Sequence, residues 1–227
     1  MSQDPNFVRA AFSSIAPRYV LANHVLSMGI DVLWRKQVAG IVHQLEPKKL
    51  LDLATGTGDL ALAIGKACPE TEIVAADFCP EMLEIAKEAG VENTMVADAM
   101  NLPFEDGEFD VVTVGYGLRN MESWEGAARE MGRVLKPDGT LVILDFSIPQ
   151  NMLRGPYRFY LHNVLPKVAG AIAGNRDAYE YLSKSIEKFP SGPAMQELLS
   201  GAGYAETRWI PLTGGISSIY VASKTAG

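Results

Sequence analysis

The chain of 227 residues has the length of one ordinary α/β domain, or of a core of about 150 residues with an accessory layer. Apolar residues make up 48% of it and charged residues 21%, which supports a packed core and excludes a disordered chain. The net charge of −7 argues against a protein that coats nucleic acid, so no nucleic-acid partner is expected.

The charge is unevenly distributed along the chain. Residues 1–49 carry six basic and three acidic side chains, for a net charge of +3. Residues 50–150 carry six basic and 19 acidic side chains, for −13, and residues 151–227 carry eight and five, for +3. An acidic middle therefore lies between two mildly basic flanks.

Cysteine usage and the N-terminus bear on the compartment. Cys68 and Cys79 form neither a disulfide framework nor a Cys-x-x-Cys pair, and with three scattered histidines they make no zinc site, so no metal is expected. The N-terminal residues lack the basic start and apolar run of a signal peptide. The apolar stretch 164–174 is short and interrupted by Pro166 and Lys167, so it cannot span a bilayer. We expect a reduced, cytoplasmic compartment.

Predicted elements follow in chain order. Helices are expected within residues 5–45, before the first strand. Strands and helices then alternate, with strands predicted at 49–54, 73–77, 94–97, 109–114 and 140–146 and helices at 60–67, 80–89 and 124–135. Asp59 is the expected N-cap of the first of these helices, and residues 137–139 form a turn before the fifth strand. The alternation predicts an α/β fold with a doubly wound, mostly parallel sheet.

The remainder of the chain has a different character. Residues 151–190 are rich in aromatic residues, glycine and proline and are predicted to be an inserted helical lid. A helix at 194–202 and a closing hairpin at 204–210 and 217–221 complete seven strands. We expect a single domain, 1–227, comprising an N-terminal helical substrate region (1–47), a cofactor-binding core (48–150), the lid (151–192) and a C-terminal helix and hairpin (193–227).

A glycine-rich loop, residues 52–59, connects the first strand to its helix. Gly56 and Gly58 permit a tight turn and close approach of a ligand to the backbone. Asp77 follows Gly56 by 21 residues, at the end of the second strand, where a carboxylate can accept both hydroxyls of a ribose. The loop alone fits a nicotinamide cofactor and an adenosyl cofactor equally well.

Further motifs favour the adenosyl cofactor. Asp98-Ala99 ends the third strand and residues 134–140 enter the fifth, and together with the loop they resemble class I S-adenosylmethionine-dependent methyltransferases. The resemblance implies that Gly56, Thr57 and Gly58 line the methionine portion, that Asp77 holds the ribose and that Asp98 and Ala99 meet the adenine. It places Phe78 and Met82 on the adenine face, although ordinary helix packing explains Met82 equally well, and Gly115 near the transferred methyl group.

The acidic residues at the strand ends fit that cofactor. Asp52, Asp59, Asp77 and Asp98 come at or just after strand ends, and an acidic rim suits a sulfonium cation. The same rim would repel a pyrophosphate, which favours helix N-termini and arginine instead.

Residues 114–120 narrow the resemblance. Their Gly117-Leu118-Arg119-Asn120 element is similar to that of the methyltransferases that act on the ring of menaquinone and ubiquinone precursors. Motifs along nearly the whole chain agree: Ile15-Ala16, Tyr19, Asn23, Trp34-Arg35, Phe159-Tyr160, Ala178-Tyr179, Phe189-Pro190, Ala202-Gly203-Tyr204 and Leu212-Thr213. Departures from the family pattern are Val20 (usually Asp), Asp31 (usually His), Asp98 (often Asn), Gly115 (serine in some members) and Tyr220 (usually His).

The chemistry expected of such an enzyme is methylation of a deprotonated quinol. Loss of a phenolic proton makes the ring carbon ortho to the oxyanion nucleophilic, and that carbon can attack the sulfonium methyl in line. The bond between the methyl group and the sulfur breaks, and the ring carbon then loses its own proton. Arg119 and Asn120 are the expected handlers of the phenolic oxygen, and Tyr19 with Tyr160 could line the ring pocket. In a second interpretation Arg119 pairs with a carboxylate such as Asp98 and fixes the loop; His162 is a weaker candidate base.

The resemblance implies a prenylated quinol as substrate. Demethylmenaquinol is favoured over a ubiquinone precursor because the chain is short, and the apolar lid could form a channel for the isoprenoid tail. A nicotinamide-dependent reductase, another small-molecule methyltransferase and a non-catalytic scaffold remain alternatives. The basic flanks, with Arg9, Arg18, Arg154 and Arg158, predict weak peripheral contact with the inner face of an anionic membrane. A homodimer is left open.

Overall fold

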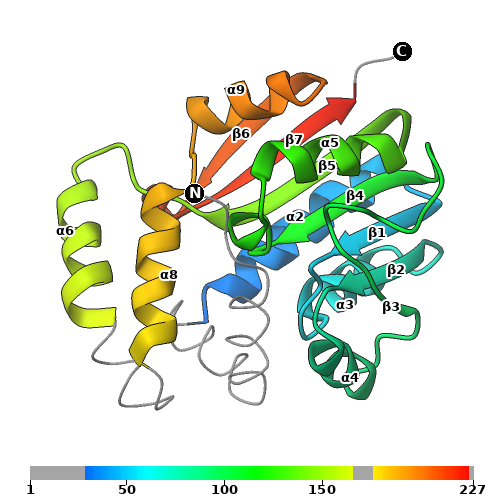
Figure 1. Cartoon of the computed structure of the whole chain (residues 1–227), viewed down its shortest axis with the longest axis horizontal. Coiled ribbons are helices and arrows are strands. Elements are labelled where there is room, and N and C mark those ends of the chain that lie inside the picture. The colour runs from blue at the N-terminus through cyan, green and yellow to red at the C-terminus, as the bar shows by residue number, and fades with distance from the viewer. Residues whose placement is uncertain (1–28, 166–175, 225–227) are drawn as a thin grey trace.

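The computed structural model describes residues 29–165 and 176–224. Its centre is a seven-stranded sheet with the order β3-β2-β1-β4-β5-β7-β6 (Figure 1). Neighbours from β3 to β5 are parallel, whereas β7 is antiparallel to both β5 and β6. The strands are β1 (Lys49–Leu53), β2 (Glu72–Asp77), β3 (Thr94–Val96), β4 (Phe109–Gly115), β5 (Leu135–Phe146), β6 (Tyr204–Leu212) and β7 (Ser217–Lys224). The predicted mostly parallel, doubly wound sheet is confirmed.

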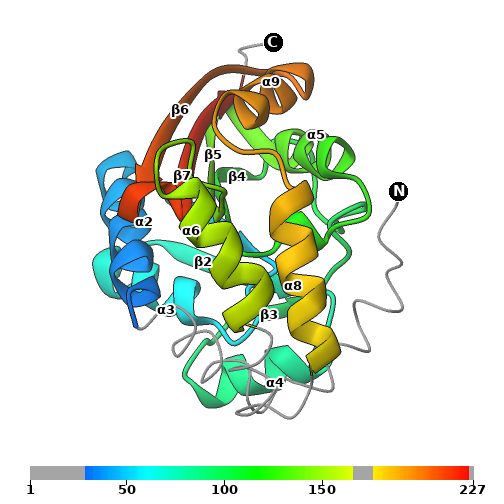
Figure 2. The ribbon, with the colours of Figure 1, turned by 90° about the vertical axis from the view of Figure 1, so that its left-hand side faces the viewer.

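Helices cover both faces of the sheet (Figure 2). They are α2 (Asp31–Leu45), α3 (Asp59–Ala67), α4 (Pro80–Glu88), α5 (Trp124–Val134), α6 (Arg154–Phe159), α8 (Arg176–Lys188) and α9 (Pro193–Gly201). On one face α2 and α3 pack in a cluster that contains Leu50, and on the other α5 and α9 pack in a cluster that contains Leu51. Successive residues of β1 point to opposite faces, so an unbroken apolar run is what a strand covered on both sides requires.

Two local predictions are wrong. Asp59 is not the N-cap of α3: that position is Gly58, with φ of 83°, and the Asp59 carboxylate instead accepts a hydrogen bond from Thr57 Oγ1 at 2.6 Å. The fifth strand begins at Leu135, not at residue 140, because Leu135 pairs with Phe109 before a register shift in β4. The expected turn at 137–139 is therefore an irregularity inside β5, with Asp138 at φ of 61°.

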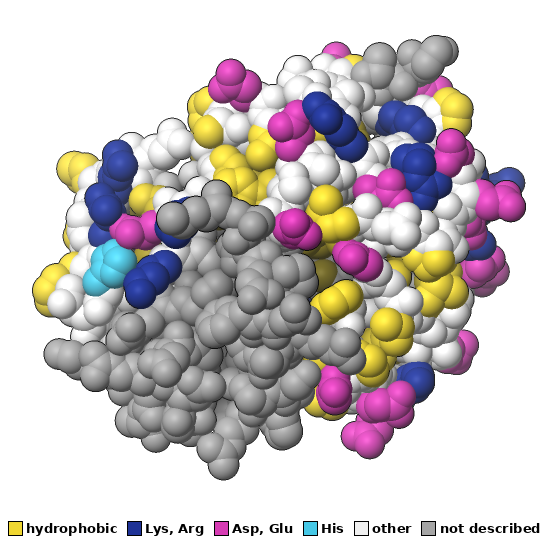
Figure 3. Space-filling view, viewed as in Figure 1, with side chains coloured by type: hydrophobic (Ala, Val, Ile, Leu, Met, Phe, Trp, Pro, Cys, Tyr) yellow, Lys and Arg dark blue, Asp and Glu magenta, His cyan; other side chains and the backbone are white. Residues whose placement is uncertain are grey.

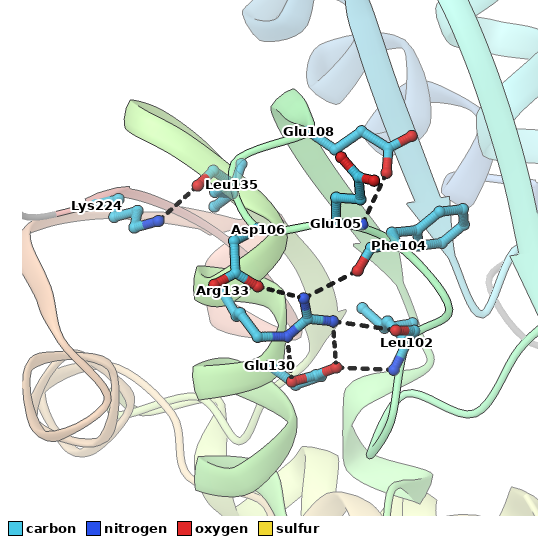
Figure 4. Close-up of polar contacts among 9 residues, drawn as sticks. All are labelled: Leu102, Phe104, Glu105, Asp106, Glu108, Glu130, Arg133, Leu135 and Lys224. Carbon is cyan, nitrogen blue, oxygen red and sulfur yellow. Dashed lines mark hydrogen bonds and ion pairs between the residues drawn. The ribbon is translucent and has the colours of Figure 1, made fainter.

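Arg133 on α5 fixes the loop that precedes β4 (Figure 4). Its guanidinium donates to the carbonyl oxygens of Leu102 and Phe104 at 3.0 and 2.9 Å, and it pairs with Asp106 at 2.6 Å and Glu130 at 2.8 Å. These bonds use most of the N–H donors of Arg133, so its role is structural: it joins α5 to the loop before β4.

The lid consists of α6, the π-helix η2 (Tyr160–Val164) and α8 (Figures 1 and 2). Leu161 and Leu165 are buried against Ile186, and Ser183 Oγ donates to the Leu161 carbonyl at 2.7 Å. The predicted helical lid is confirmed for 154–164 and 176–188, while residues 166–175 and the helices expected before residue 29 lie outside the described residues. Within the described part of the chain, no helix is long and apolar enough to cross a bilayer.

Candidate active site

A cavity of about 150 Å³ lies at the carboxyl ends of β1, β2 and β4, the edge at which open parallel sheets bind ligands. Its walls come from five segments: Leu53–Gly56, Asp77–Met82, Ala97–Met100, Gly115–Gly117 and Asn120–Glu122. Six of the nine residues predicted to bind the cofactor line it directly, namely Gly56, Asp77, Phe78, Met82, Asp98 and Ala99, and a seventh, Gly115, lines it from β4. Thr57 and Gly58 are absent from the described residues that line the cavity.

The glycine-rich loop needs its glycines for two different reasons. Gly56 has φ of 58° and nothing within 4 Å of the place where a Cβ would be, so its demand is conformational. At Gly58, with φ of 83°, a Cβ would lie 2.5 Å from Val91 Cγ2 and 3.2 Å from Ala86 Cβ. Gly58 therefore lets the start of α3 pack on the segment after α4, and Gly56 presents bare backbone to the cavity.

Asp77 is held by backbone donors on both sides. Its Oδ2 accepts from Gly56 N at 2.8 Å and its Oδ1 accepts from Cys79 N at 2.9 Å. Burial raises the pKa of Asp77, and the backbone N–H groups of Cys79, Gly56 and Phe78 oppose that rise. A carboxylate has about four lone-pair sites, so beside these backbone donors Asp77 retains acceptor capacity toward the cavity in a fixed orientation.

The predicted acidic rim is only partly correct. Asp77 and Asp98 line the cavity, but Asp52 is fully buried beneath the loop. Its carboxylate accepts from Thr55 Oγ1 and Thr113 Oγ1, each at 2.6 Å, and burial raises its pKa from 3.8 to about 6. Asp52 thus ties the loop to β4, and Asp59 is occupied by Thr57.

The proposed adenine side consists of Asp98, Ala99, Phe78 and Met82. Asp98 Oδ1 accepts from Met100 N at 2.9 Å, which fixes the turn after β3. Phe78 is 38% exposed, whereas Met82 is 2% exposed and packs with Cys79. Met82 therefore serves both interpretations, since it is packed in the protein and also forms part of the cavity wall.

The turn after β4 forms the opposite wall. Tyr116 has φ of 59°, and a Cβ on Gly117 would lie 2.4 Å from Ala54 Cβ, so this turn packs tightly on the glycine-rich loop. Residues Leu118–Asn120 form a short 3-10 helix, η1. Asn120 lines the cavity, and its Nδ2 donates to the Tyr116 carbonyl at 3.3 Å.

Arg119 is not among the described residues that line the cavity. It is 3% exposed, pairs with Asp145 Oδ1 at 2.8 Å and also donates to the Tyr116 carbonyl. Burial raises the pKa of Asp145, and the adjacent Arg119 guanidinium opposes that rise. This is the loop-fixing arrangement of the second interpretation, with Asp145 rather than Asp98 as the carboxylate.

Two other candidates, Tyr160 and His162, are not among the described residues that line the cavity, and Tyr19 lies outside the described residues. Tyr160 is half-buried and stacks on Tyr157, with ring centroids 6.4 Å apart. The His162 Nε2 lies 3.0 Å from Glu187 Oε1 on the lid surface. Of the lid residues expected in an apolar channel, Leu165 is buried, but Val164 is 36% exposed.

Sequence reasoning missed an aromatic and ionic cluster beside the turn. Tyr116 and Phe146 have ring centroids 4.7 Å apart, and the Arg35 guanidinium carbon lies 5.7 Å from the Tyr116 centroid. Arg35 forms a buried ion pair with Asp31, one of the departures from the family pattern. A signal for Asp145 was present, because it ends the fifth strand as Asp77 and Asp98 end theirs; nothing in the sequence marked the contact of Arg35 with Tyr116.

Comparison with solved structures identifies the class. A SAM-dependent methyltransferase of Thermotoga maritima superposes with a TM-score of 0.68 at 18% identity, covering 96% of this chain and all of that one. The citrinin polyketide synthase C-methyltransferase domain superposes with a TM-score of 0.66 at 16% identity, covering 92% of this chain and 57% of that one. The fold is therefore that of the S-adenosylmethionine-dependent methyltransferases.

Sequence comparison identifies the family. Residues 1–224 match the model of the ubiE/COQ5 methyltransferase family, and the chain belongs to that family. It is 45% identical to a demethylmenaquinone methyltransferase of Thermus thermophilus, over 94% of this chain and 99% of that protein. It is 40% identical to a ubiquinone/menaquinone biosynthesis C-methyltransferase of Citrifermentans bemidjiense, over 99% of each.

Proposed function

We propose that the chain transfers the methyl group of S-adenosylmethionine to a ring carbon of a prenylated quinol, converting demethylmenaquinol to menaquinol. The observation that carries the proposal is that one cavity joins Asp77, the expected ribose acceptor, to the turn that contains Asn120. The family and the names of the relatives support the choice of chemistry and favour the naphthoquinol over a benzoquinol.

The residues of the cavity fit the donor. S-adenosylmethionine supplies an electrophilic methyl group on a sulfonium. In the proposal, Asp77 accepts the ribose hydroxyls while Gly56 N and Cys79 N hold its carboxylate in place. Asp98 and Ala99 meet the adenine edge, and Phe78 and Met82 flank it. Gly56, with Thr57 and Gly58 behind it, shapes the loop around the methionine portion.

The turn handles the quinol. Asn120 lies in the cavity wall and is the residue we propose to contact the phenolic oxygen. Arg119 acts as a positioning residue. Its bond to the Tyr116 carbonyl and its ion pair with Asp145 hold the turn, in which Tyr116 is left-handed, so that Asn120 lies in the cavity wall. Gly115 leaves room beside the transferred methyl group, and Tyr19 is proposed to line the ring pocket.

The test is methyl transfer from labelled S-adenosylmethionine to demethylmenaquinone that has been chemically reduced. We expect label in the naphthoquinol, none in the oxidised quinone and less in a prenylated benzoquinol precursor. Preferential labelling of the benzoquinol would overturn the choice of substrate, and labelling of the oxidised quinone alone would overturn the phenolate mechanism. S-adenosylmethionine, and not NADH, should raise the melting temperature; the reverse would favour the nicotinamide-dependent reductase.

A further inference from the structure

The outer surface of the lid combines exposed apolar side chains with positive charge. Met152 is 95% exposed and Phe159 is 64% exposed, and Leu153 is 46% exposed. Phe159 ends α6, and Met152 and Leu153 form the turn that leads into the same helix. A methionine and a phenylalanine this exposed on one surface mark a site of contact with something apolar.

That surface is rigidly attached to the core. Asn151 Nδ2 donates to the Gly214 carbonyl at 3.0 Å, and a Cβ on Gly214 would lie 2.5 Å from Leu153 Cδ1. On the inner side, Leu161 and Leu165 are buried against Ile186 of α8. The lid segment 151–165 therefore has buried apolar side chains on its inner side and exposed apolar side chains at Met152, Leu153 and Phe159.

The charge around the surface is positive. Residues 151–165 contain Arg154, Arg158 and His162 and no acidic residue. Glu187 of α8 lies beside them, and its Oε1 is shared by Arg158 Nε at 2.8 Å and His162 Nε2 at 3.0 Å. Exposed Lys184 and Lys188 follow on α8. In Figure 3, basic side chains, a histidine and apolar side chains lie where α6 is, whereas the acidic side chains on the opposite side of the molecule are interspersed with basic ones.

We propose that this lid surface, Met152, Leu153 and Phe159 with Arg154 and Arg158, docks on the headgroup region of an anionic lipid bilayer. The apolar side chains enter the interface, and the two guanidinium groups contact lipid phosphates. The inference rests on the proposed function, because a prenylated quinol is held in the bilayer and must be taken from it. A second copy of the chain fits less well, because symmetric pairing would bring the arginines of two lids together.

Vesicle co-sedimentation without S-adenosylmethionine or quinol tests the docking. We expect the wild-type chain to bind phosphatidylcholine vesicles containing 30% phosphatidylglycerol at low salt, about tenfold more weakly in 0.5 M NaCl and on pure phosphatidylcholine. Phe159→Ser and Met152→Ser should each weaken binding about tenfold, since each removes a large apolar side chain from the interface. Arg154→Gln should weaken binding only to the anionic vesicles.

Val96→Ser is the matched control, because Val96 is 55% exposed and lies on β3, at the far edge of the sheet. It should bind as wild type, and all variants should keep the wild-type melting temperature. Equal vesicle binding by Phe159→Ser and wild type would overturn the proposal. So would a loss of vesicle binding in Val96→Ser as large as that in Phe159→Ser, or a wild-type dimer that Phe159→Ser converts to a monomer. Phe159→Ser and Met152→Ser should also retain turnover on detergent-dispersed quinol and lose it on vesicle-held quinol, whereas Val96→Ser should retain both. Absence of turnover on both would refute the proposed function and leave the vesicle result standing.

Discussion

The two sides of the cavity are built differently. On the side of β1, β2 and β3, Asp77 is held by backbone donors, because its carboxylate accepts from Gly56 N and Cys79 N. On the side of the turn and the lid, ion pairs join one side chain to another, as in Arg119 with Asp145 and Arg158 with Glu187. Backbone contacts suit a ligand that many proteins share, whereas contacts between side chains can change with the substrate.

The largest effect on stability is expected at the buried ion pair between Arg119 and Asp145, on the side of the turn and the lid. Arg119→Met leaves the Asp145 carboxylate buried without its cation, which should lower the free energy of unfolding by about 3–5 kcal/mol. Urea unfolding measures this. Turnover should fall as well, because the turn that presents Asn120 loses the bond to the Tyr116 carbonyl.

The double variant Arg119→Met/Asp145→Leu is the control. It removes both charges, so most of the lost stability should return, while turnover should stay low. A double variant as unstable as the single one would mean that Arg119 stabilises the turn by something other than its pairing with Asp145.

On the cofactor side, Asp77→Asn should raise the Kd of S-adenosylmethionine about 100-fold. An amide NH₂ would have to face either Gly56 N or Cys79 N, both donors, and the charged acceptor for the ribose would be lost. Isothermal titration calorimetry measures the affinity. Glu84→Gln, on the exposed surface of α4, should leave it unchanged, and a Kd within threefold of wild type for Asp77→Asn would refute the ribose assignment.

On the same side of the cavity, Asp52 should make the free energy of unfolding depend on pH. Its pKa is raised from 3.8 to about 6 in the folded chain, so the folded state binds more protons than the unfolded state between those values. This contribution to stability is complete below about pH 3.8 and is lost as the pH rises through 6. Relative to Asp52→Asn, the wild-type chain should lose about 2 kcal/mol of unfolding free energy between pH 4.5 and 7.5.

Urea unfolding at several pH values measures that difference. Val96→Ser, at an exposed position and without a titratable side chain in either form, is the control and should give a constant difference from wild type. A constant difference for Asp52→Asn would show that the carboxylate has an ordinary pKa in the folded chain.

The sequence predicted the cofactor side in more detail than the other. Gly56 and Asp77 belong to one strand–loop–helix–strand unit, where spacing alone brings them together. The pairing of Arg119 with Asp145 depends on the register of β5 against β4, and the burial of Asp52 depends on Thr113 of β4, which the pattern of a single strand does not reveal. The prediction of Asp59 as the cap is wrong because Gly58, in its left-handed conformation, occupies the cap position and α3 begins at Asp59.

The smallest effect is expected at the joint between the lid and the sheet. Tyr220, where the family usually has histidine, is buried on β7, and its hydroxyl accepts from Gly192 N at 2.8 Å, between α8 and α9. Tyr220→Phe leaves that buried N–H without its acceptor, which should cost about 1–2 kcal/mol of stability. Tyr204→Phe is a matched control, since the Tyr204 hydroxyl donates to the Ala128 carbonyl at 2.9 Å in the core, away from the lid. Both variants should be destabilised similarly, but only Tyr220→Phe should speed amide hydrogen exchange in residues 182–192. Equal exchange in the two variants would show that Tyr220 is an ordinary core residue and does not anchor the lid.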